Sequence, residues 1–338
     1  MAVGTAQAVS PAPIEENLDA IHRKADRRIG LVDLITAAIL LGAGLAVAAS
    51  SEFNRDVVLL VCVYTLAGLG MYVPLVLNGQ LSLAYAAYVS MGAYAVGWVS
   101  LNTSISPAIG IIFGMAVAAI AAALLGLVTV KLNGFYLAGV TFLFDRAFKA
   151  YIIESDWIGG ASGLSNFSAG QFLGVQLTRP VVSAAALVVT LLLVVYVARL
   201  RRGPFGLLAR FQREAGRTVE SAGVRSLAVK VACLALGAAI AAVAGGLFTL
   251  QNRSVYPETF GLNILSIAIF APLLGGQRSP WGAALGAAVV CWLYFGMNVA
   301  QDTGTLVFSL AVVAIVRLAP GGVLGLVSSL WAKVRPNT

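Results

Sequence analysis

Charged side chains are scarce in this chain of 338 residues, because Asp, Glu, Lys and Arg together make up 11% of it. Soluble domains carry about 25% charged residues, so this composition excludes an ordinary soluble globule. Histidine occurs once, at His22, which excludes a catalytic or metal site built on histidines. The three cysteines, Cys62, Cys233 and Cys291, lie far apart in apolar segments and predict buried thiols without metal-ligand spacing.

Two further features are missing from the sequence: a phosphate-binding loop and an apolar N-terminal region. It contains no GxxxxGK[ST] loop for nucleotide phosphates, and its catalytic residue types do not gather in one segment, so we expect a chain that is not an enzyme. The first 28 residues contain no apolar region, which argues against a signal peptide. Their basic run RKADRR at 23–28 predicts instead a tail, 1–29, that ends in a cytoplasmic anchor.

Hydrophobic residues make up 59% of the chain, and several apolar runs exceed the ~18 residues that indicate a membrane-spanning helix. The sequence therefore predicts an all-α, polytopic helix bundle in a lipid bilayer. The ten expected spans are 31–50, 57–77, 81–101, 107–130, 135–154, 180–198, 230–250, 262–275, 281–298 and 304–318. The third is rich in small and polar residues, and the eighth is short enough to be re-entrant or broken.

The distribution of basic residues predicts the orientation of these spans. Of 22 basic residues, only Arg55, Arg179 and Arg253 fall in segments that would be outside if both termini are cytoplasmic. The net charge of +8 therefore follows the positive-inside rule and does not indicate nucleic-acid binding. This topology predicts a transmembrane domain at 30–330 with a cytoplasmic loop at 199–229, and a cytoplasmic tail at 331–338.

Small residues recur at helical spacing along several expected spans. Such spacing lets helix backbones approach closely in lipid, where hydrophobicity itself drives no association. Taken together, they favour a compact bundle. The sets are Gly110 with Gly114, Gly282 with Gly286, and Gly237 with Ala241 and Gly245.

The longest charged stretch, residues 199–230, predicts an amphipathic helix near 206–223. Apolar or small residues form one stripe at spacings of three and four, and Gly223 stands where a glycine commonly ends a helix. From spacing alone, two interpretations stay open: a helix on lipid headgroups, or a helix that docks into a cytoplasmic partner. The stripe consists of Leu208, Phe211, Ala215, Val219 and Ala222.

Residues 79–94, GQLSLAYAAYVSMGAY, are unusually polar for a stretch between two apolar runs. Irregular backbone at membrane depth survives only beside protein or a water-filled cavity, and transporters often place such a break near the substrate path. We predict one broken or re-entrant segment near 78–90, with Gln80, Ser82 and Tyr85 offering reversible hydrogen bonds to a solute. The alternative is that the serines and glycines only pack this helix against its neighbours.

Asp145, Arg146 and Lys149 place charges well inside the fifth expected span. An unpaired charge at the bilayer centre costs ~2.5–3.5 kcal/mol on insertion scales. Asp145 and Lys149 are four residues apart on one helix face, so we expect them to pair. A structural salt bridge is favoured over direct contact with a zwitterionic substrate.

Seven motifs, in order between about 57 and 326, resemble the M-type permease subunits of bacterial branched-chain amino acid ABC importers. The signatures that they resemble are Gly-Gln-x-Ser-Leu-Gly-His, the segment around Tyr-Phe-x-x-Val-Thr, an external Gly-Gly-x-x-Gly-Leu and a cytoplasmic Arg-Glu-Asn-Glu motif. The sequence departs from this pattern at Ala84-Tyr85 and at Ala215-Gly216. The seven stretches are GQLSLAYAAYVSMGAY, LNGFYLAGVTFLF, IGGASGL, REAGRTVESAGV, SVYPETF, LLGGQRSPWGAALGA and LAPGGVLGL.

The resemblance implies a transport subunit in the bacterial cytoplasmic (inner) membrane that translocates branched-chain amino acids, or urea or a short amide as in the wider family. Implied partners are ABC ATPase subunits that bind the ATP and magnesium, a second related permease, and an extracytoplasmic solute-binding protein touching loops 154–179 and 251–261. The 206–223 helix is then the coupling helix that docks on the ATPase. No cofactor is expected in this chain.

The candidate residues fall into two sets. For the substrate pathway they are Gly79, Gln80, Ser82, Tyr85, Tyr88, Thr141, Asp145 and Lys149, and for ATPase coupling they are Arg213, Glu214, Arg217, Glu220 and Gly223. An alternative function is a self-sufficient secondary transporter or channel that uses Asp145 and Lys149 as a titrating pair.

Overall fold

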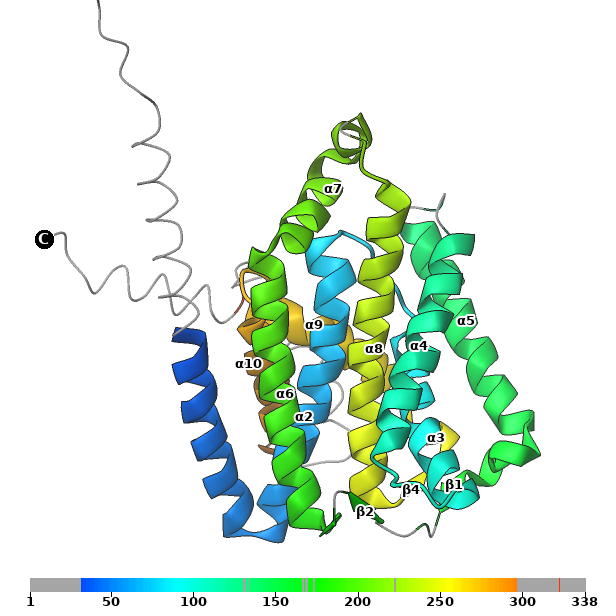
Figure 1. The fold of residues 1–338 in the computed structure, drawn as a ribbon, viewed down its shortest axis with the longest axis vertical. Helices are drawn as coiled ribbons and strands as arrows, with labels where there is room; N and C mark the ends of the chain where they lie inside the picture. The colour runs from blue at the N-terminus through cyan, green and yellow to red at the C-terminus, as the bar shows by residue number, and fades with distance from the viewer. Residues whose placement is uncertain are drawn as a thin grey trace, which may run out of the picture.

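Helices dominate the computed structural model (Figure 1), which describes residues 32–129, 132, 134–165, 167, 170–172, 174–221, 223–296 and 322. The first described helix is Val32–Ser50. It is followed by α2 (Glu52–Tyr72) with a π-helical turn (Val73–Leu77), α3 (Tyr85–Asn102), α4 (Ile109–Val128), α5 (Phe135–Glu154), α6 (Arg179–Arg202), α7 (Pro204–Ser221), α8 (Ser226–Asn252), α9 (Leu262–Gly275) and α10 (Trp281–Gly296).

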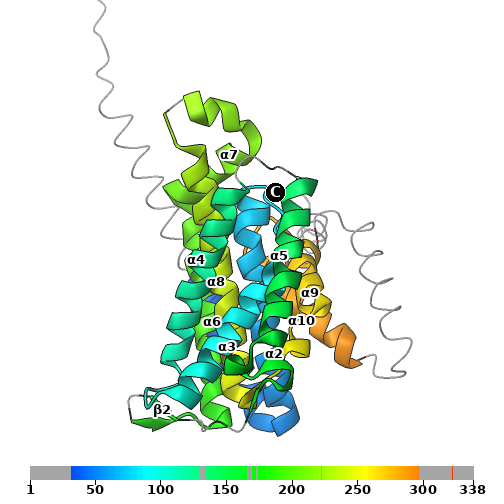
Figure 2. The same ribbon diagram turned by 90° about the vertical axis from the view of Figure 1, so that its right-hand side faces the viewer.

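Two short antiparallel ladders lie at one end of the bundle. In the first, β1 (Leu164–Ser165) pairs with β4 (Ser254–Val255), and in the second, β2 (Gln171–Phe172) pairs with β3 (Val175–Gln176). α7 lies at the other end and extends beyond the neighbouring helices in both views (Figures 1 and 2). We call these the strand end and the α7 end.

Six helices among the described residues are long and apolar enough to cross a membrane: Val32–Ser50, Glu52–Leu77, Ile109–Val128, Arg179–Arg202, Ser226–Asn252 and Pro257–Gly275. The prediction of a polytopic membrane helix bundle is thus confirmed. α3 and α5 also lie in the bundle, but α3 carries polar residues and α5 carries charges. The expected tenth span, 304–318, and the two tails lie outside the described residues, so the count of ten stays a prediction.

Two helix boundaries differ from the expected spans for local reasons. α2 begins five residues early because the Ser51 side chain accepts a hydrogen bond from the Asn54 N–H at 3.1 Å and caps the helix. α3 begins at Tyr85, because residues 78–84 are not helical. The broken segment predicted near 78–90 is therefore present over 78–84, and we call these seven residues the break.

Close backbone contacts hold α3 against α4 and α8, which also pack against each other. A methyl group added to Gly92 would lie 1.9 Å from the Ala242 carbonyl oxygen, and one added to Gly245 would lie 1.8 Å from that of Val89. Where α4 meets α3, one added to Gly114 would lie 2.7 Å from the Gly92 Cα. The predicted packing through small residues is confirmed, since no side chain larger than hydrogen fits at these crossings.

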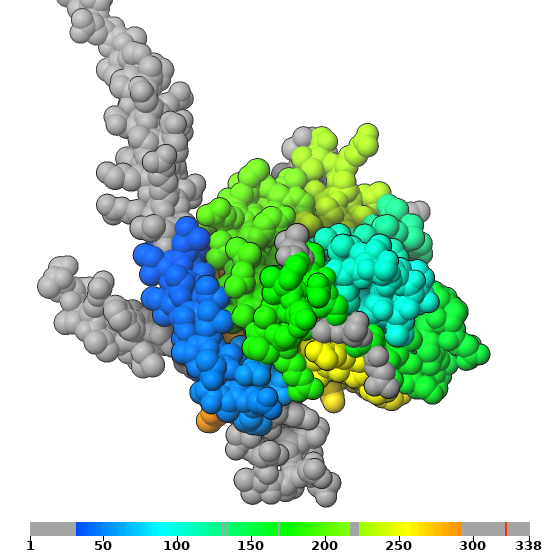
Figure 3. Space-filling model, turned by 60° about the horizontal axis from the view of Figure 1, so that its bottom comes forward, coloured from blue at the N-terminus to red at the C-terminus, as the bar shows by residue number. Residues whose placement is uncertain are grey.

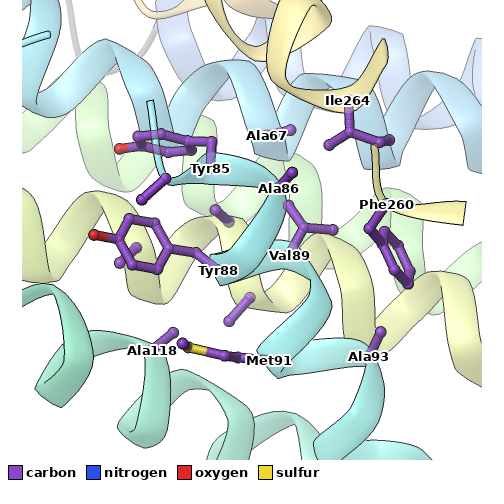
Figure 4. Close-up of a cluster of buried hydrophobic side chains, with 14 of the residues drawn as sticks. Ala67, Tyr85, Ala86, Tyr88, Val89, Met91, Ala93, Ala118, Phe260 and Ile264 are labelled. Atoms are coloured by element: carbon purple, nitrogen blue, oxygen red, sulfur yellow. The ribbon is translucent and has the colours of Figure 1, made fainter. Parts of the chain in front are cut away.

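The start of α3 lies in the main cluster of buried side chains. Figure 4 shows Tyr85 and Tyr88 with both rings on one side of α3, and Phe260 and Ile264 on the other. Tyr85 and Tyr88 are at most 1% exposed. Cys62, Cys233 and Cys291 are buried, as their apolar context predicts.

Two helices lie at opposite margins of the bundle. The helix Val32–Ser50 is almost wholly exposed and forms one edge in Figures 1 and 3. α5 stands at the other edge in Figure 1, and it buries only Leu137, Ala138, Thr141, Asp145 and Ile152.

Candidate functional site

The break follows directly from the end of α2. Pro74 cannot donate a backbone hydrogen bond, and the helix widens into the π-helical turn Val73–Leu77 around it. The N–H of Gly79 then bonds the Leu75 carbonyl at 3.1 Å, and the N–H of Gln80 bonds that of Pro74 at 2.8 Å. Gly79 turns the chain with a φ of +71°, a left-handed conformation that favours glycine.

The other end of the break is held by two side chains of α5. The hydroxyl of Thr141 accepts a hydrogen bond from the Leu83 N–H at 2.8 Å. One turn further along α5, the carboxylate of Asp145 accepts one from the Ala87 N–H at 2.6 Å. Ala84, at the N-cap of α3, has no side-chain acceptor, so α5 supplies the cap from outside the helix. The negative charge of Asp145 also suits the positive end of the α3 dipole.

The expected pairing of Asp145 with Lys149 is wrong. The carboxylate of Asp145 pairs instead with the guanidinium of the adjacent Arg146, whose Nε lies 3.1 Å from Oδ2. The Asp145 side chain is 1% exposed, and its two oxygens have protein partners: Oδ1 accepts from the Ala87 N–H and Oδ2 pairs with Arg146. Arg146 is one-third exposed and also lies over the Phe142 ring, 5.4 Å from its centroid.

Lys149 pairs with Glu258, a residue from the strand end. Its Nζ lies 2.8 Å from the Glu258 Oε2, and Glu258 stands in a short 3₁₀ helix, Pro257–Thr259, that follows β4. Sequence reasoning missed this partner because the contact joins residues 109 positions apart. No local pattern signals this partner, because Glu258 lies in a loop that is distant in sequence.

The remaining predicted pathway residues lie together around the break, where Ser82, Tyr85 and Tyr88 are buried, Gln80 is partly exposed and Gly79 is exposed. Tyr85 donates its hydroxyl to the Gly70 carbonyl at 2.8 Å, and its ring meets Tyr88 edge-to-face at 5.6 Å. Gln80 accepts from the Asn78 side chain at 2.8 Å, and Ser82 is fully buried. The structure thus gathers seven of the eight pathway candidates, from Gly79 to Tyr88 together with Thr141 and Asp145, and places Lys149 toward the strand end.

α7 consists of two halves that meet at Ala215, whose φ of −142° and ψ of 55° are not helical. The first half packs on the bundle through buried Ala209 and Gln212, and the Gln212 amide lies 2.5 Å from the Ser226 hydroxyl. Phe211, from the predicted apolar stripe, is 52% exposed and faces away from the bundle. The outward face of α7 is therefore available to a partner.

Of the coupling candidates, Arg213 faces the break. Its Nη1 donates to the Val76 carbonyl at 2.7 Å. Arg213 and its neighbour Glu214 are both exposed. Gly223 has a φ of +81°, as expected for a glycine that ends a helix. The side chains of Arg217 and Glu220 lie outside those that the structure describes.

The loop IGGASGL joins α5 to β1 at the strand end. Gly163 adopts a φ of +68°, and an added methyl group there would lie 2.2 Å from the Val255 carbonyl oxygen. The loops 154–179 and 251–261, predicted to face a common partner, thus contact each other through the β1–β4 ladder, and the Lys149–Glu258 pair joins α5 to the second loop.

A family model described as branched-chain amino acid transport system / permease component matches residues 55–319. The chain belongs to this family. The match begins in α2 and includes the break, α7 and every described helix from α3 to α10, so the candidate residues all fall within the permease region. The multi-pass membrane character of the chain agrees with this family.

Two curated relatives are high-affinity branched-chain amino acid transport system permease proteins LivM, from Salmonella typhimurium and Escherichia coli. Each is 25% identical to the permease chain over 265 residues, which is 71% of this chain. The match spans 62% of the length of these curated relatives. No solved structure matches the chain.

Proposed function

We propose that this chain is a transmembrane permease subunit of an ABC importer that carries branched-chain amino acids or a related small polar solute such as urea or a short amide. The observation that carries the proposal is the family match over 55–319, which covers both ends of the bundle and the break between them. The names of the two curated relatives support amino acids as the first substrates to test.

In this proposal the α7 end is cytoplasmic and the strand end is outside. The basic residues of 199–230 support this orientation by the positive-inside rule, and it agrees with the predicted ten-span topology in which both termini are cytoplasmic. An external binding protein delivers solute to the paired loops at the strand end. A separate ATPase subunit binds α7 and also binds the ATP and magnesium. A second related permease completes the pathway.

The break serves as part of the solute route. Its backbone leaves the helical pattern beside α5, where Thr141 and Asp145 hold it in place. Half-helices that meet inside a membrane protein offer polar groups at depth, where a lipid-facing helix offers none. The Asn78 and Gln80 amides and the Ser82 hydroxyl are the polar side chains of this segment.

The competing idea of a secondary transporter required Asp145 and Lys149 to act as one titrating pair. Each of these residues has a different partner, Arg146 for the first and Glu258 for the second. Nothing in this geometry favours ion-driven transport, and we do not pursue it.

The decisive experiment reconstitutes the chain in liposomes with its ATPase subunits, its partner permease and its binding protein, with leucine, isoleucine, valine, urea and acetamide as solutes. We expect uptake against a gradient only when ATP and the ATPase are present. Replacing residues 213–223 should abolish uptake together with ATPase association. Accumulation of solute without any ATPase would overturn the proposal.

A further inference from the structure

Arg213 reaches back to the bundle from the helix that extends farthest beyond it. Its Nη1 donates to the Val76 carbonyl at 2.7 Å. The aliphatic part of its side chain also lies against the break, since a methyl group added to Gly79 would lie 2.9 Å from the Arg213 Cγ. Arg213 is exposed overall, but its guanidinium and its Cγ are turned toward the bundle and away from the outer face of α7.

The position of this guanidinium has a clear physical reason. The last carbonyls of a helix have no partners within it and need donors from elsewhere. The carbonyls of Pro74 and Leu75 receive backbone N–H groups from the break, and that of Val76 receives Arg213. A cation at this place also suits the negative end of the helix dipole.

The two ends of the break are therefore held by opposite charges from two other elements. Arg213 of α7 caps the helix that enters the break, and Asp145 of α5 caps the helix that leaves it. The bonded backbone groups belong to Val76, in the last turn before the break, and Ala87, in the first turn after it. A displacement of α7 has a direct mechanical path to this segment.

The non-helical Ala215 divides α7 at the residue where such a path should begin. Before it, Gln212 and Arg213 bond Ser226 and Val76, two residues of different helices. After it, the chain leaves the bundle (Figures 1 and 2). The half that precedes Ala215 is attached to the membrane domain on its inner face, and we expect a partner on its outward face and on the half that follows Ala215.

We propose that Arg213 is a positioning residue that passes the movement of α7 to the break, and that it does not itself dock on the ATPase. This inference rests on the proposed function and assigns to one contact the transfer of motion between the partner and the solute route. It differs from the sequence-based expectation, in which Arg213 added an electrostatic contact to the ATPase.

The test uses the full importer complex in liposomes and measures ATPase association, ATP hydrolysis and solute uptake for Arg213→Ala. We expect the ATPase to stay bound and to hydrolyse ATP, while the solute carried per ATP falls by roughly tenfold. Arg213→Lys, which keeps the charge and loses the guanidinium geometry, should lose less. Arg199→Ala removes the same charge from the exposed end of α6 and should behave as wild type.

Each other outcome has a definite meaning. If Arg213→Ala carries as much solute per ATP as wild type, or if it releases the ATPase, the inference is wrong. If the wild-type chain takes up solute without ATP, or never binds an ATPase, the proposed function itself is wrong. The two failures are distinguishable because the second is seen without any substitution.

A second pair of variants decides the matter if Arg213→Ala does not fold. Gly79→Ala should displace the Arg213 side chain and lower the solute carried per ATP. Gly174→Ala is its matched control, because Gly174 also has a positive φ, +79°, and a methyl group there meets nothing within 4 Å. Both variants carry the same kind of backbone strain. Equal uptake per ATP in the two variants would contradict the inference.

Discussion

The helix Val32–Ser50 and α3 are both uncharged over most of their length, yet they differ in how much of their surface is buried. The first is strongly apolar and lies almost wholly exposed at one margin. α3 carries serines, tyrosines and glycines and is buried along most of its length. This difference arises because, in lipid, moving an apolar side chain from the bilayer into the protein lowers its free energy only a little. Small residues and polar contacts decide which helix occupies the centre.

The largest expected effect comes from the same substitution made in each helix. Gly92→Leu in α3 would drive a side chain into the Ala242 backbone, so we expect loss of a folded, monodisperse protein in detergent. Gly42→Leu in the first helix meets nothing within 4 Å and should purify as wild type. Size-exclusion chromatography after purification checks both. Similar elution profiles for the two variants would contradict the idea that α3 is tightly packed and the first helix is not.

The next effect concerns the charge that holds the start of α3. Asp145→Ala removes the acceptor of the Ala87 N–H and leaves Arg146 without its partner, so it should cost about 3 kcal/mol. Thr141→Val removes only the acceptor of the Leu83 N–H and should cost about 1–2 kcal/mol. Unfolding in mixed detergent micelles measures both. A larger loss for Thr141→Val would show that the charge contributes little.

A smaller effect is expected where the first helix is attached. The Asp33 carboxylate lies 2.6 Å from the Arg202 Nη1 and accepts from the Trp281 Nε1 at 3.0 Å. Arg202 is partly exposed, so Asp33→Ala should cost about 1 kcal/mol. We also expect protease to cut more readily between this helix and α2. Unchanged proteolysis would mean that apolar contacts alone hold the helix.

The smallest effect is expected on the outer face of the first helix. Ile39 is 65% exposed, so Ile39→Ala should change the free energy of unfolding by less than about 0.5 kcal/mol. The measurement is the same micelle-unfolding assay. A loss comparable with that of Asp145→Ala would indicate that this face is covered by protein.

Patterns local to one segment were readable from the sequence. The apolar runs predicted the helices, and the polar, glycine-containing stretch after Asn78 predicted the break. The spacing of Gly110 and Gly114 predicted a close crossing, which the backbone contacts of Gly114 with α3 confirm. These features depend on residues within a few turns of one another, so their signal is carried by composition and period.

The partners of the charged residues were not readable. Spacing paired Asp145 with Lys149 because they share one helix face, but the structure offers Asp145 an N–H from α3 and offers Lys149 a carboxylate from a distant loop. Arg213 was likewise assigned to an outer surface, since nothing in the sequence places α7 beside the end of α2. Contacts between distant segments depend on the fold, which periodicity does not specify.

The packing of α3 also limits how the bundle can rearrange. Because Gly92 and Gly245 form close backbone contacts between α3 and α8, and Gly114 forms one between α4 and α3, we expect that α3 cannot roll or slide without backbone collisions with α4 or α8. α3, α4 and α8 must then behave as one rigid block in any working cycle. We expect rearrangement at the margins instead, where few side chains of α5 and of the helix 32–50 are buried.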